Sequence, residues 1–215
     1  MNKEMIEKAV ENIIKKLEGL NRPPTIGLGS GKTAAYVLKI LGEKLSERGI
    51  KPIGVPSSSQ IKLEVMDYFT IAELSFDSLD LVIDGADQAS KVNNYIIKGG
   101  GGALTRERIL WEMAKERHVF ISKEKLVSVL NFPLPVEFLP FSFKLVQKRI
   151  LELGLKPTLR ADAKGYPFVT ENGNFIFDVS YGEGLDLKEA YHQIKEIPGV
   201  VDAGLFVYDV NLYLL

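Results

Sequence analysis

Short apolar runs alternate with helical patterns through the first 121 residues, and this alternation restricts the possible fold more than any other feature of the chain. Apolar residues recur at helical spacing between some of the runs, as they also do from Met5 to Leu17. Strands that alternate with helices form mainly parallel sheets covered by those helices. The sequence therefore predicts a Rossmann-like α/β domain, with a mainly parallel sheet and helices on both faces. The runs are Thr25 to Leu28, Ile50 to Val55, Leu79 to Ile83, Tyr95 to Ile97 and His118 to Ile121.

The pattern changes near Asn131, where the stretch NFPLPVEFLPF carries three prolines in eleven residues. Prolines at this density favour an extended edge or a crossover over a helix. The segments beyond it indicate the order βαββαβ, which is typical of a smaller ferredoxin-like α+β domain. They are a strand at 135–139, a helix at 144–153, strands at 157–160, 168–170 and 175–179, a helix at 187–197 and a strand at 201–207, which is one strand more than that order contains.

These segments predict two domains. Residues 1–131 and 206–215 form the Rossmann-like catalytic domain, and residues 132–205 form the small domain. The dipeptide Asn172-Gly173 predicts a hairpin that joins the strands at 168–170 and 175–179. The last apolar run, Leu212 to Leu215, is too short for another unit and is expected to rejoin the first sheet.

Composition excludes several classes of function. The 27 Lys and Arg residues nearly balance the 28 Asp and Glu residues, which leaves too little charge for an extended nucleic-acid surface. The chain has no cysteine and only two histidines, His118 and His192, which argues against thiolate chemistry and against Cys-rich or multi-histidine metal sites. No stretch approaches the roughly 18 apolar residues of a membrane span. A cytoplasmic protein that binds neither nucleic acid nor membrane is expected.

The stretch IGLGSGKTAAYVL lies between a predicted strand and a predicted helix. Backbone N–H groups at such a helix start favour a phosphate, and Ser30, Lys32 and Thr33 add two hydroxyls and a cation. Nucleotide motifs fail on spacing, because a Walker A motif needs glycine at Ile26 and a GxGxxG motif needs it at Lys32. The alternative is that the glycines only permit a tight turn.

Two carboxylates, Asp84 and Asp87, follow the apolar run in LDLVIDGADQ. Ligands of open α/β sheets bind outside the carboxyl ends of the strands, so both carboxylates are expected to face the same crevice as the first glycine loop. The alternative is structural: Asp87 caps the next segment, and Asp84 forms an Asx turn.

Four successive glycines in YIIKGGGGALTRERILWEMAK carry a large entropic cost, which indicates that the backbone approaches something closely there. Lys98 precedes them, and a helix is expected to begin near Ala103. A helical wheel places Glu107 in the middle of its apolar face, among Ala103, Leu104, Leu110, Trp111 and Ala114. The alternatives are a buried salt bridge, with Arg106 as one partner, and a proton-transferring carboxylate whose pKa is raised by desolvation.

Other candidates have weaker support. Ser57 to Ser59 are suited to binding a polyol, although capping of the next helix is favoured. Lys123 and Lys125 form either a solvated charge run or part of the same sheet edge. The two histidines have no hydroxyl partner nearby in the sequence and are expected to be structural or surface residues.

Taken together, these motifs resemble the A type of ribose-5-phosphate isomerase, over nearly the whole chain. Two departures are visible, because the family usually has Ser or Thr in place of Lys32 and Glu in place of Gln88. The first concerns phosphate affinity, and the second removes a charge beside the site. The shared motifs are GLGSGKTA, VPSSSQ, DGADQ, IKGGGGALTRERI, SKEKLV, FPLPVEFLPF and FVTENGNFIFDV.

The resemblance implies roles for particular residues. Glu107 is the implied catalytic base, and Asp84, Asp87 and Lys98 are implied to act on the sugar hydroxyls and reacting oxygens. The implied substrate-binding residues are Ser30, Gly31, Lys32, Thr33 and Lys125 for the 5-phosphate, and Gly85, Ala86, Gly99, Gly100 and Gly101 around the sugar.

The resemblance also implies the reaction, which interconverts D-ribose 5-phosphate and D-ribulose 5-phosphate through an enediolate in the non-oxidative branch of the pentose phosphate pathway. It implies no metal, no organic cofactor and a homodimer or homotetramer. One alternative is a non-catalytic sugar-phosphate sensor of the same fold, and retention of Lys98 and Glu107 counts against it. Another is an amino-sugar deaminase, which the βαββαβ domain and the GGGGALTRE stretch disfavour.

Overall fold

The computed structural model describes residues 3–215, and its contacts divide the chain into two compact units. The first unit contains residues 3–86, 106–126 and 209–215, and the second contains residues 87–105 and 127–208. Each unit is described by itself below. The predicted domains, 1–131 with 206–215 and 132–205, draw the boundary elsewhere and stay a prediction.

The first unit is built on a parallel sheet with the strand order β14-β7-β4-β1-β2-β3. Every pair of neighbouring strands in it is parallel, as predicted. All residues of β1 and β4 are buried, and because side chains alternate along a strand, both faces of these strands are covered. The strands are β1 Thr25–Leu28, β2 Ile53–Pro56, β3 Thr70–Ile71, β4 Leu79–Asp84, β7 Ala114–Ile121 and β14 Asn211–Leu214.

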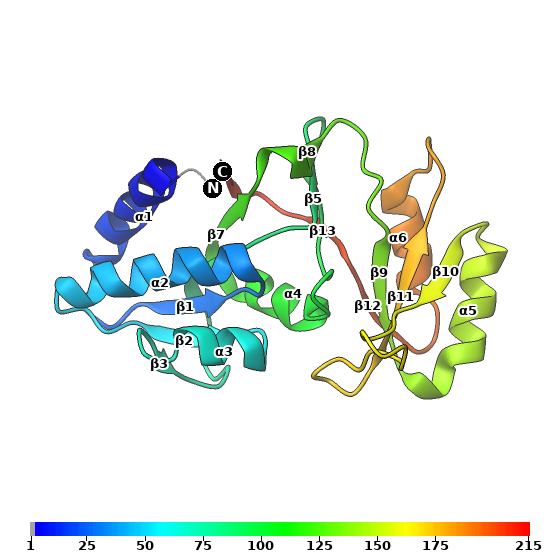
Figure 1. Cartoon of the computed structure of the whole chain (residues 1–215), viewed down its shortest axis with the longest axis horizontal. Helices are drawn as coiled ribbons and strands as arrows, with labels where there is room; N and C mark the ends of the chain where they lie inside the picture. The colour runs from blue at the N-terminus through cyan, green and yellow to red at the C-terminus, as the bar shows by residue number, and fades with distance from the viewer. Residues whose placement is uncertain (1–2) are drawn as a thin grey trace. The chain divides into compact units, whose positions relative to one another are not determined.

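Helices α1 and α2 contact each other, and α2 also contacts β4 and β7 (Figure 1). The buried face of α1 includes Ile6, Val10 and Ile13, which recur at the spacing predicted from the sequence. β14 pairs with β7, so the last apolar run does rejoin the first sheet. The helices are α1 Lys3–Leu17, α2 Lys32–Glu47, α3 Ser59–Val65 and α4 Leu104–Met113, the last of which begins in the second unit, and a short 3-10 helix covers Lys123–Lys125.

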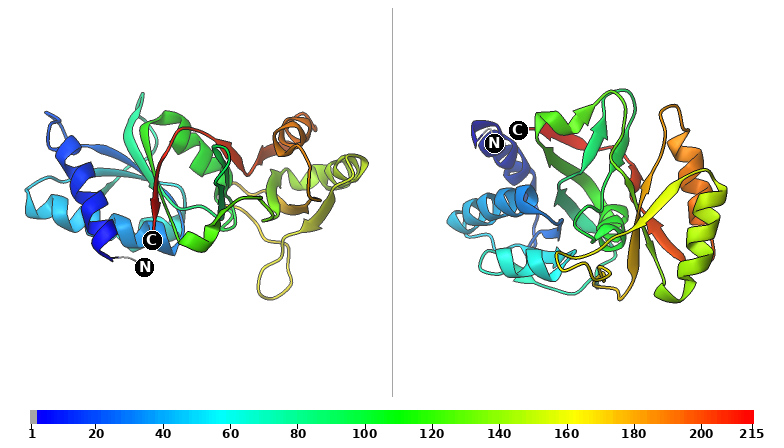
Figure 2. Two further views of the ribbon diagram at one scale, coloured as in Figure 1. Left: turned by 90° about the horizontal axis from the view of Figure 1, so that it is seen from above. Right: turned by 45° about the vertical axis from the view of Figure 1, so that its right-hand side comes forward.

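The second unit contains an antiparallel sheet with the order β10-β11-β9-β12. Helices α5 and α6 lie on one face of it (Figures 1 and 2), and a shared apolar core joins them to the strands. This βαββαβ order confirms the predicted ferredoxin-like pattern. The elements are β9 Leu134–Phe138, α5 Phe143–Glu152, β10 Lys156–Leu159, β11 Phe175–Ser180, α6 Leu187–Lys195 and β12 Val200–Ala203, and a second 3-10 helix covers Pro140–Ser142.

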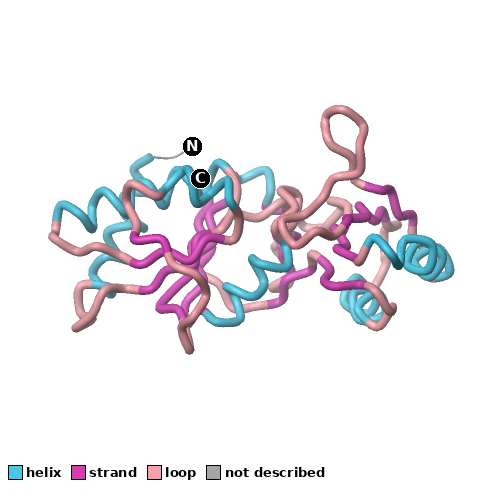
Figure 3. The backbone as a smooth tube through the Cα atoms, turned by 90° about the horizontal axis from the view of Figure 1, so that it is seen from below, coloured by secondary structure: helices cyan, strands magenta, loops and turns pink. Residues whose placement is uncertain are grey.

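One predicted strand is wrong. Residues 168–170 form no strand, and β10 pairs directly with β11 across a long connection that projects from the unit (Figure 3). The Asn172-Gly173 turn does form, with Gly173 at φ +77° and the Thr170 N–H donating to the Asn174 carbonyl at 2.9 Å. The hairpin signal therefore identified a tight turn whose first arm is not part of the sheet.

The strand predicted at 201–207 is divided in two at Gly204. A Cβ atom at Gly204 would lie 2.2 Å from the Lys98 carbonyl oxygen, so only glycine permits this close approach. Beyond it, the chain joins a different sheet, with the order β13-β6-β5-β8. The strands of that sheet are β5 Gln88–Ser90, β6 Tyr95–Ile97, β8 Leu126–Val127 and β13 Leu205–Val207.

None of the helices within residues 3–215 has the length and apolar character needed to cross a membrane.

Candidate active site

The first glycine loop, residues 27–31, leads from β1 into α2. A Cβ atom at Gly29 would lie 2.2 Å from the carboxyl carbon of Asp84, so the loop can approach this carboxylate only as glycine. Gly31 caps α2 with φ +96° and provides no side-chain hydrogen bond to the helix. The first-turn amides of this 16-residue helix therefore have no side-chain cap, which is the arrangement that favours a phosphate.

Three serine hydroxyls gather beside this loop. The Ser30 Oγ lies 2.7 Å from the Ser57 Oγ and donates to the Ser58 Oγ at 3.0 Å. Ser58 is also the N-cap of α3, where its hydroxyl accepts from the Ile61 N–H at 3.3 Å. The serine cluster therefore both caps α3 and lies beside the first glycine loop.

The two candidate lysines differ in their surroundings. Lys32 is the exposed first residue of α2, followed by the partly exposed Thr33. Lys125 is partly buried, and its Nζ donates to the Ala86 carbonyl oxygen at 2.7 Å. Lys125 is thus fixed on the segment that follows β4, while exposed Lys123 precedes it in the same short 3-10 helix.

Asp84, the last residue of β4, is fully buried. Its Oδ2 accepts from the Trp111 indole N–H at 2.8 Å, and its Oδ1 accepts from the Gly85 N–H at 2.7 Å. Hydrogen bonds to both oxygens offset the cost of burying this carboxylate and fix its orientation. The sequence placed Trp111 on the face of α4 that carries Glu107 but gave no sign of its bond to Asp84.

Glu107 has an exposed fraction of only 4 %. Leu104, Leu110 and Trp111 are buried with it, so the helical wheel placed this carboxylate correctly on the buried face of α4. A raised pKa for this group and its role as a base stay predictions.

The second glycine loop, residues 99–102, lies in the second unit. Asp87 holds it, because its Oδ2 accepts from the Gly100 N–H at 2.7 Å. A Cβ atom at Gly100 would lie 2.4 Å from the Asp87 Oδ1, and Gly99 and Gly102 have φ values of +103° and +83°. Three of the four glycines are thus explained by a close approach or by a left-handed backbone.

Lys98, just before this loop, has an exposed fraction of only 3 %. Its backbone N–H donates to the Gly204 carbonyl oxygen at 2.9 Å, and its ammonium lies 5.8 Å from the centre of the Phe206 ring. The position of Lys98 is thus set by β13 and the glycine that precedes it.

Gln88, which follows Asp87, is held by hydrogen bonds on both atoms of its side-chain amide. Its Oε1 accepts from the backbone N–H groups of Asn131 and Phe132 at 2.8 and 3.0 Å, and its Nε2 donates to the Asn131 Oδ1 at 2.6 Å. A carboxylate could accept the first two bonds but could not donate the third. Gln88 therefore fixes the segment that leads into β9.

The predicted site residues divide between the two units. The first unit holds residues 30–33, 84–86, 107 and 125, and the second holds residues 87 and 98–101. Within each unit the structure brings one of the two carboxylates to a glycine loop, namely Asp84 to Gly29 and Asp87 to Gly100. Sequence reasoning missed Arg160, which binds the second glycine loop and for which no local pattern gave a signal.

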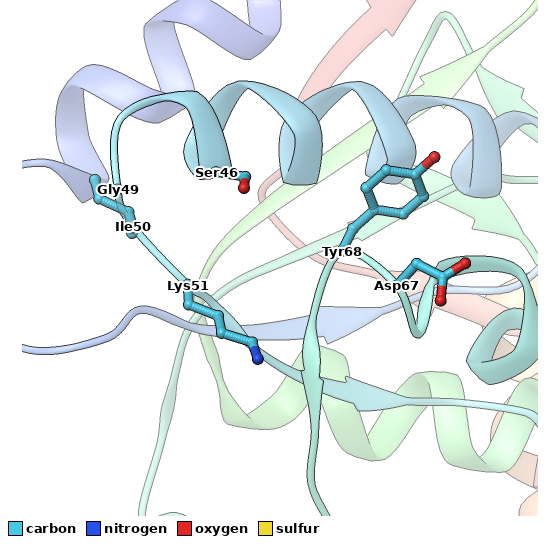
Figure 4. A pocket seen from close by; sticks show the side chains of 6 residues that line it. All are labelled: Ser46, Gly49, Ile50, Lys51, Asp67 and Tyr68. Atoms are coloured by element: carbon cyan, nitrogen blue, oxygen red, sulfur yellow. The ribbon is translucent and has the colours of Figure 1, made fainter.

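The first unit also has a hollow of about 390 Å³ that is lined by none of the predicted site residues (Figure 4). Its residues lie at the end of α2 or before β2 and β3, which is the amino end of the parallel strands. Ligand crevices of such sheets lie at the carboxyl ends. It is lined by Ser46, Gly49, Ile50, Lys51, Asp67 and Tyr68.

Histidine and carboxylate side chains within residues 3–215 form no cluster of three that could hold a metal ion. His118 is buried in the first unit, 3.0 Å from the Tyr213 hydroxyl and 3.2 Å from the Glu116 carboxylate. Burial lowers the pKa of His118, although Glu116 acts in the opposite direction.

Comparison with known proteins gives the family. The family model for ribose 5-phosphate isomerase A (phosphoriboisomerase A) matches residues 53–214. The chain belongs to this family. It is 38 % identical over 199 residues to the ribose-5-phosphate isomerase A of Thermomicrobium roseum, covering 88 % of this chain and 81 % of the relative. It is 40 % identical over 190 residues to that of Methanococcus aeolicus, covering 84 % of this chain and 79 % of the relative.

Solved structures of ribose 5-phosphate isomerases share the fold. The enzyme from Methanocaldococcus jannaschii superposes with a TM-score of 0.84 at 33 % identity, covering 97 % of this chain and 92 % of that one. A D-ribose-5-phosphate isomerase in complex with phospho-erythronic acid gives the same TM-score at 35 % identity, covering 98 % of this chain and 93 % of that one. The mainly parallel sheet with a smaller antiparallel domain is therefore the fold of the ribose 5-phosphate isomerase A family.

Proposed function

We propose that this chain is an aldose–ketose isomerase that interconverts D-ribose 5-phosphate and D-ribulose 5-phosphate through an enediolate. The observation that carries the proposal is the buried Glu107 carboxylate on the apolar face of α4, within the part of the chain that the isomerase family model matches. A relative that binds phospho-erythronic acid supports a phosphorylated sugar as the ligand.

In the proposed reaction, Glu107 removes the proton from C2 of the open-chain aldose. A double bond then forms between C1 and C2, and the C1 carbonyl oxygen becomes the negative oxygen of the enediolate. Glu107 next returns a proton to C1. One further proton must pass from the C2 hydroxyl to the C1 oxygen, after which the ketose is complete. General-base catalysis is most efficient when the pKa of the base is near the working pH. Shielding from water moves the pKa of a carboxylate upward in that direction, which is why a buried carboxylate is suited to this transfer.

The negative oxygen of the enediolate requires donors that are in place before the reaction. Lys98 and the amides of the second glycine loop are the proposed donors. In the free protein the Gly100 amide already donates to Asp87, so we assign the direct donation to Lys98 and to the remaining amides of Gly99 and Gly101. Asp84 or Asp87 assists ring opening or the proton transfer between the oxygens, and Gly85 and Ala86 adjoin them.

The 5-phosphate is proposed to bind at the uncapped start of α2. Ser30, Gly31, Lys32 and Thr33 contribute amides, hydroxyls and a cation there, and Lys125 is the second proposed cation. The motif lies directly before a helix of 16 residues, which provides both the free amides and the positive end of the helix dipole.

Three finer statements belong to the same proposal. The reaction is assigned to the non-oxidative branch of the pentose phosphate pathway in the cytoplasm. The assembly is a homodimer or homotetramer, which a light-scattering mass decides. Neither a metal ion nor an organic cofactor takes part.

The decisive experiment incubates the pure protein with ribose 5-phosphate in buffer that contains a chelator and no added cofactor. Formation of ribulose 5-phosphate is the expected result. Binding of the sugar phosphate without any ketose would favour a sensor domain, and activity only on an amino-sugar phosphate would favour a deaminase. Activity that is lost to the chelator and restored by one divalent ion would contradict the cofactor-free mechanism.

A further inference from the structure

Arg160, one residue beyond β10, binds the second glycine loop with a single nitrogen atom. Its Nη1 donates to the carbonyl oxygens of Gly99 and Gly100 at 2.7 and 3.1 Å. The other side of the same guanidinium donates to Asp178 on β11, through Nε at 2.9 Å and through Nη2. One side chain therefore joins the small antiparallel sheet to two successive peptides of the loop.

The Gly99–Gly100 peptide is held from both sides. Its carbonyl accepts from Arg160, while its N–H donates to the Asp87 carboxylate at 2.7 Å. The C=O and N–H groups of a trans peptide lie in one plane and point in opposite directions, so Arg160 and Asp87 lie at opposite edges of this peptide. The next carbonyl, that of Gly100, also points to Arg160, and the Gly101 N–H consequently points away from Arg160.

The loop needs such support because its glycines have no side chains that could restrict the backbone. The Arg160 side chain is 12 % exposed, and the negative charge of Asp178 balances the positive charge of its guanidinium. Asp178 lies opposite Thr158 in the β10–β11 register. The guanidinium also lies 5.9 Å from the centre of the Phe168 ring, and a Cβ atom at Gly102 would lie 2.4 Å from that ring. Arg160 is thus itself held in one orientation before it binds the loop.

We propose that Arg160 is a positioning residue for the isomerase reaction. By holding the Gly99 and Gly100 carbonyls, it keeps the Asp87 carboxylate and the Gly101 amide oriented for the reacting oxygens, and it touches no substrate itself. The inference rests on the proposed function. If Arg160 has this role, the antiparallel sheet of the second unit affects the reaction rate by holding Arg160 through Asp178.

The test replaces Arg160 with Ala and with Lys. A displacement of about 1 Å in a catalytic group can cost about 10²-fold in rate, so Arg160→Ala is expected to lower kcat by about that factor with little change in KM for ribose 5-phosphate. Arg160→Lys is expected to lose at least tenfold, since an ammonium group lacks the rigid fork that binds Asp178 and both carbonyls together. Guanidinium ion at millimolar, non-denaturing concentration should restore part of the kcat of Arg160→Ala.

The matched control is Lys195→Ala in the same unit. Lys195 likewise donates to a backbone carbonyl, that of Val201 at 2.8 Å, and to a carboxylate, that of Asp202 at 3.1 Å. It contacts no part of the glycine loop in these bonds, so this variant should lose stability but keep the parental kcat. Thermal unfolding of all variants separates loss of fold from loss of rate.

Several outcomes would overturn the inference. A folded Arg160→Ala protein with kcat within twofold of the parent would do so, as would a loss confined to KM or an equal loss of kcat in Lys195→Ala. If Arg160→Ala does not fold, a folded Arg160→Lys protein with the parental kcat would by itself overturn the inference. Failure of the proposed function is distinguishable from these results, because the unmodified chain would then make no ketose.

Discussion

The two glycine loops of this protein are held in different ways. The first, residues 27–31, is part of the parallel-sheet framework: the Gly29 N–H donates to the Ile83 carbonyl on β4 at 2.9 Å, and the loop ends at the start of α2. The second, residues 99–102, is held by side chains, with Arg160 on its carbonyls and Asp87 on one amide. The loop proposed to bind phosphate is thus held by regular structure, whereas the loop proposed to orient particular peptides is held by side-chain partners.

The difference also separates the proposed tasks of the loops. The uncapped start of α2 offers several equivalent amides to a phosphate, which tolerates small displacements. The proposed task of the second loop is to present individual amides to oxygens whose charge changes during the reaction, and for such a task orientation determines the rate. Changes in the first loop should therefore affect substrate binding, and changes in the second should affect the chemical step.

The largest effect is expected from neither loop but from Glu107, the proposed base. Glu107→Gln keeps the volume of the side chain and removes the proton acceptor, so kcat should fall by about 10²- to 10⁴-fold while the fold is retained. Glu112→Gln is the matched control, because Glu112 is an exposed carboxylate on the same helix. Steady-state rates with ribose 5-phosphate and circular dichroism of both variants make the comparison.

Within the second loop, alanine substitutions at two adjacent glycines are expected to have effects of very different size on kcat. A Cβ atom at Gly100 would lie 2.4 Å from the Asp87 Oδ1, whereas no atom lies within 4 Å of a Cβ at Gly101. Gly100→Ala should therefore displace Asp87 and lower kcat by about 10²-fold, and Gly101→Ala should cost much less. Equal kcat values for the two variants would show that the position of Asp87 is not what the loop controls.

At the proposed phosphate site, which the first loop adjoins, the expected effect is on binding. Thr33→Ala and Lys125→Ala each remove a proposed phosphate contact, and a hydrogen bond to a charged group contributes about 1.5–3 kcal/mol. KM for ribose 5-phosphate should rise about tenfold or more in each variant, with kcat nearly unchanged, as for an interaction shared by the ground and transition states. A loss of kcat at unchanged KM would require that the phosphate bind elsewhere.

How much the sequence could predict follows the same division. The parallel sheet, α2 after its glycine loop and the buried face that carries Glu107 all depend on periodicity over short stretches, and these predictions are confirmed. The contact of Arg160 with Gly99 joins residues 61 positions apart, and no local pattern encodes it. The turn at Asn172-Gly173 was predicted correctly, but the strand before it was wrong, because turn residues do not determine whether the preceding arm joins the sheet.

The smallest expected effect concerns His118, which lies on β7 and belongs to neither loop. Burial lowers its pKa in the folded protein, so the unfolded chain binds a proton more readily. The free energy of unfolding should therefore decrease as the pH falls below about 6.5, the ordinary pKa of histidine. Urea unfolding at pH 7.5 and 5.5 should show this decrease in the parent and a smaller one in His118→Gln. An identical decrease in both would assign the pH dependence to other groups.

Isotope exchange tests whether Glu107 moves a proton through an enediolate. Ribose 5-phosphate is incubated with the protein in deuterium oxide, and the label at C1 of the ketose and at C2 of the recovered aldose is followed by NMR. We expect solvent deuterium to enter at both carbons, and Glu107→Gln to slow exchange and isomerisation in parallel. A folded Glu107→Gln protein that exchanges and isomerises at the parental rate would contradict it and make Asp87 the next residue to test.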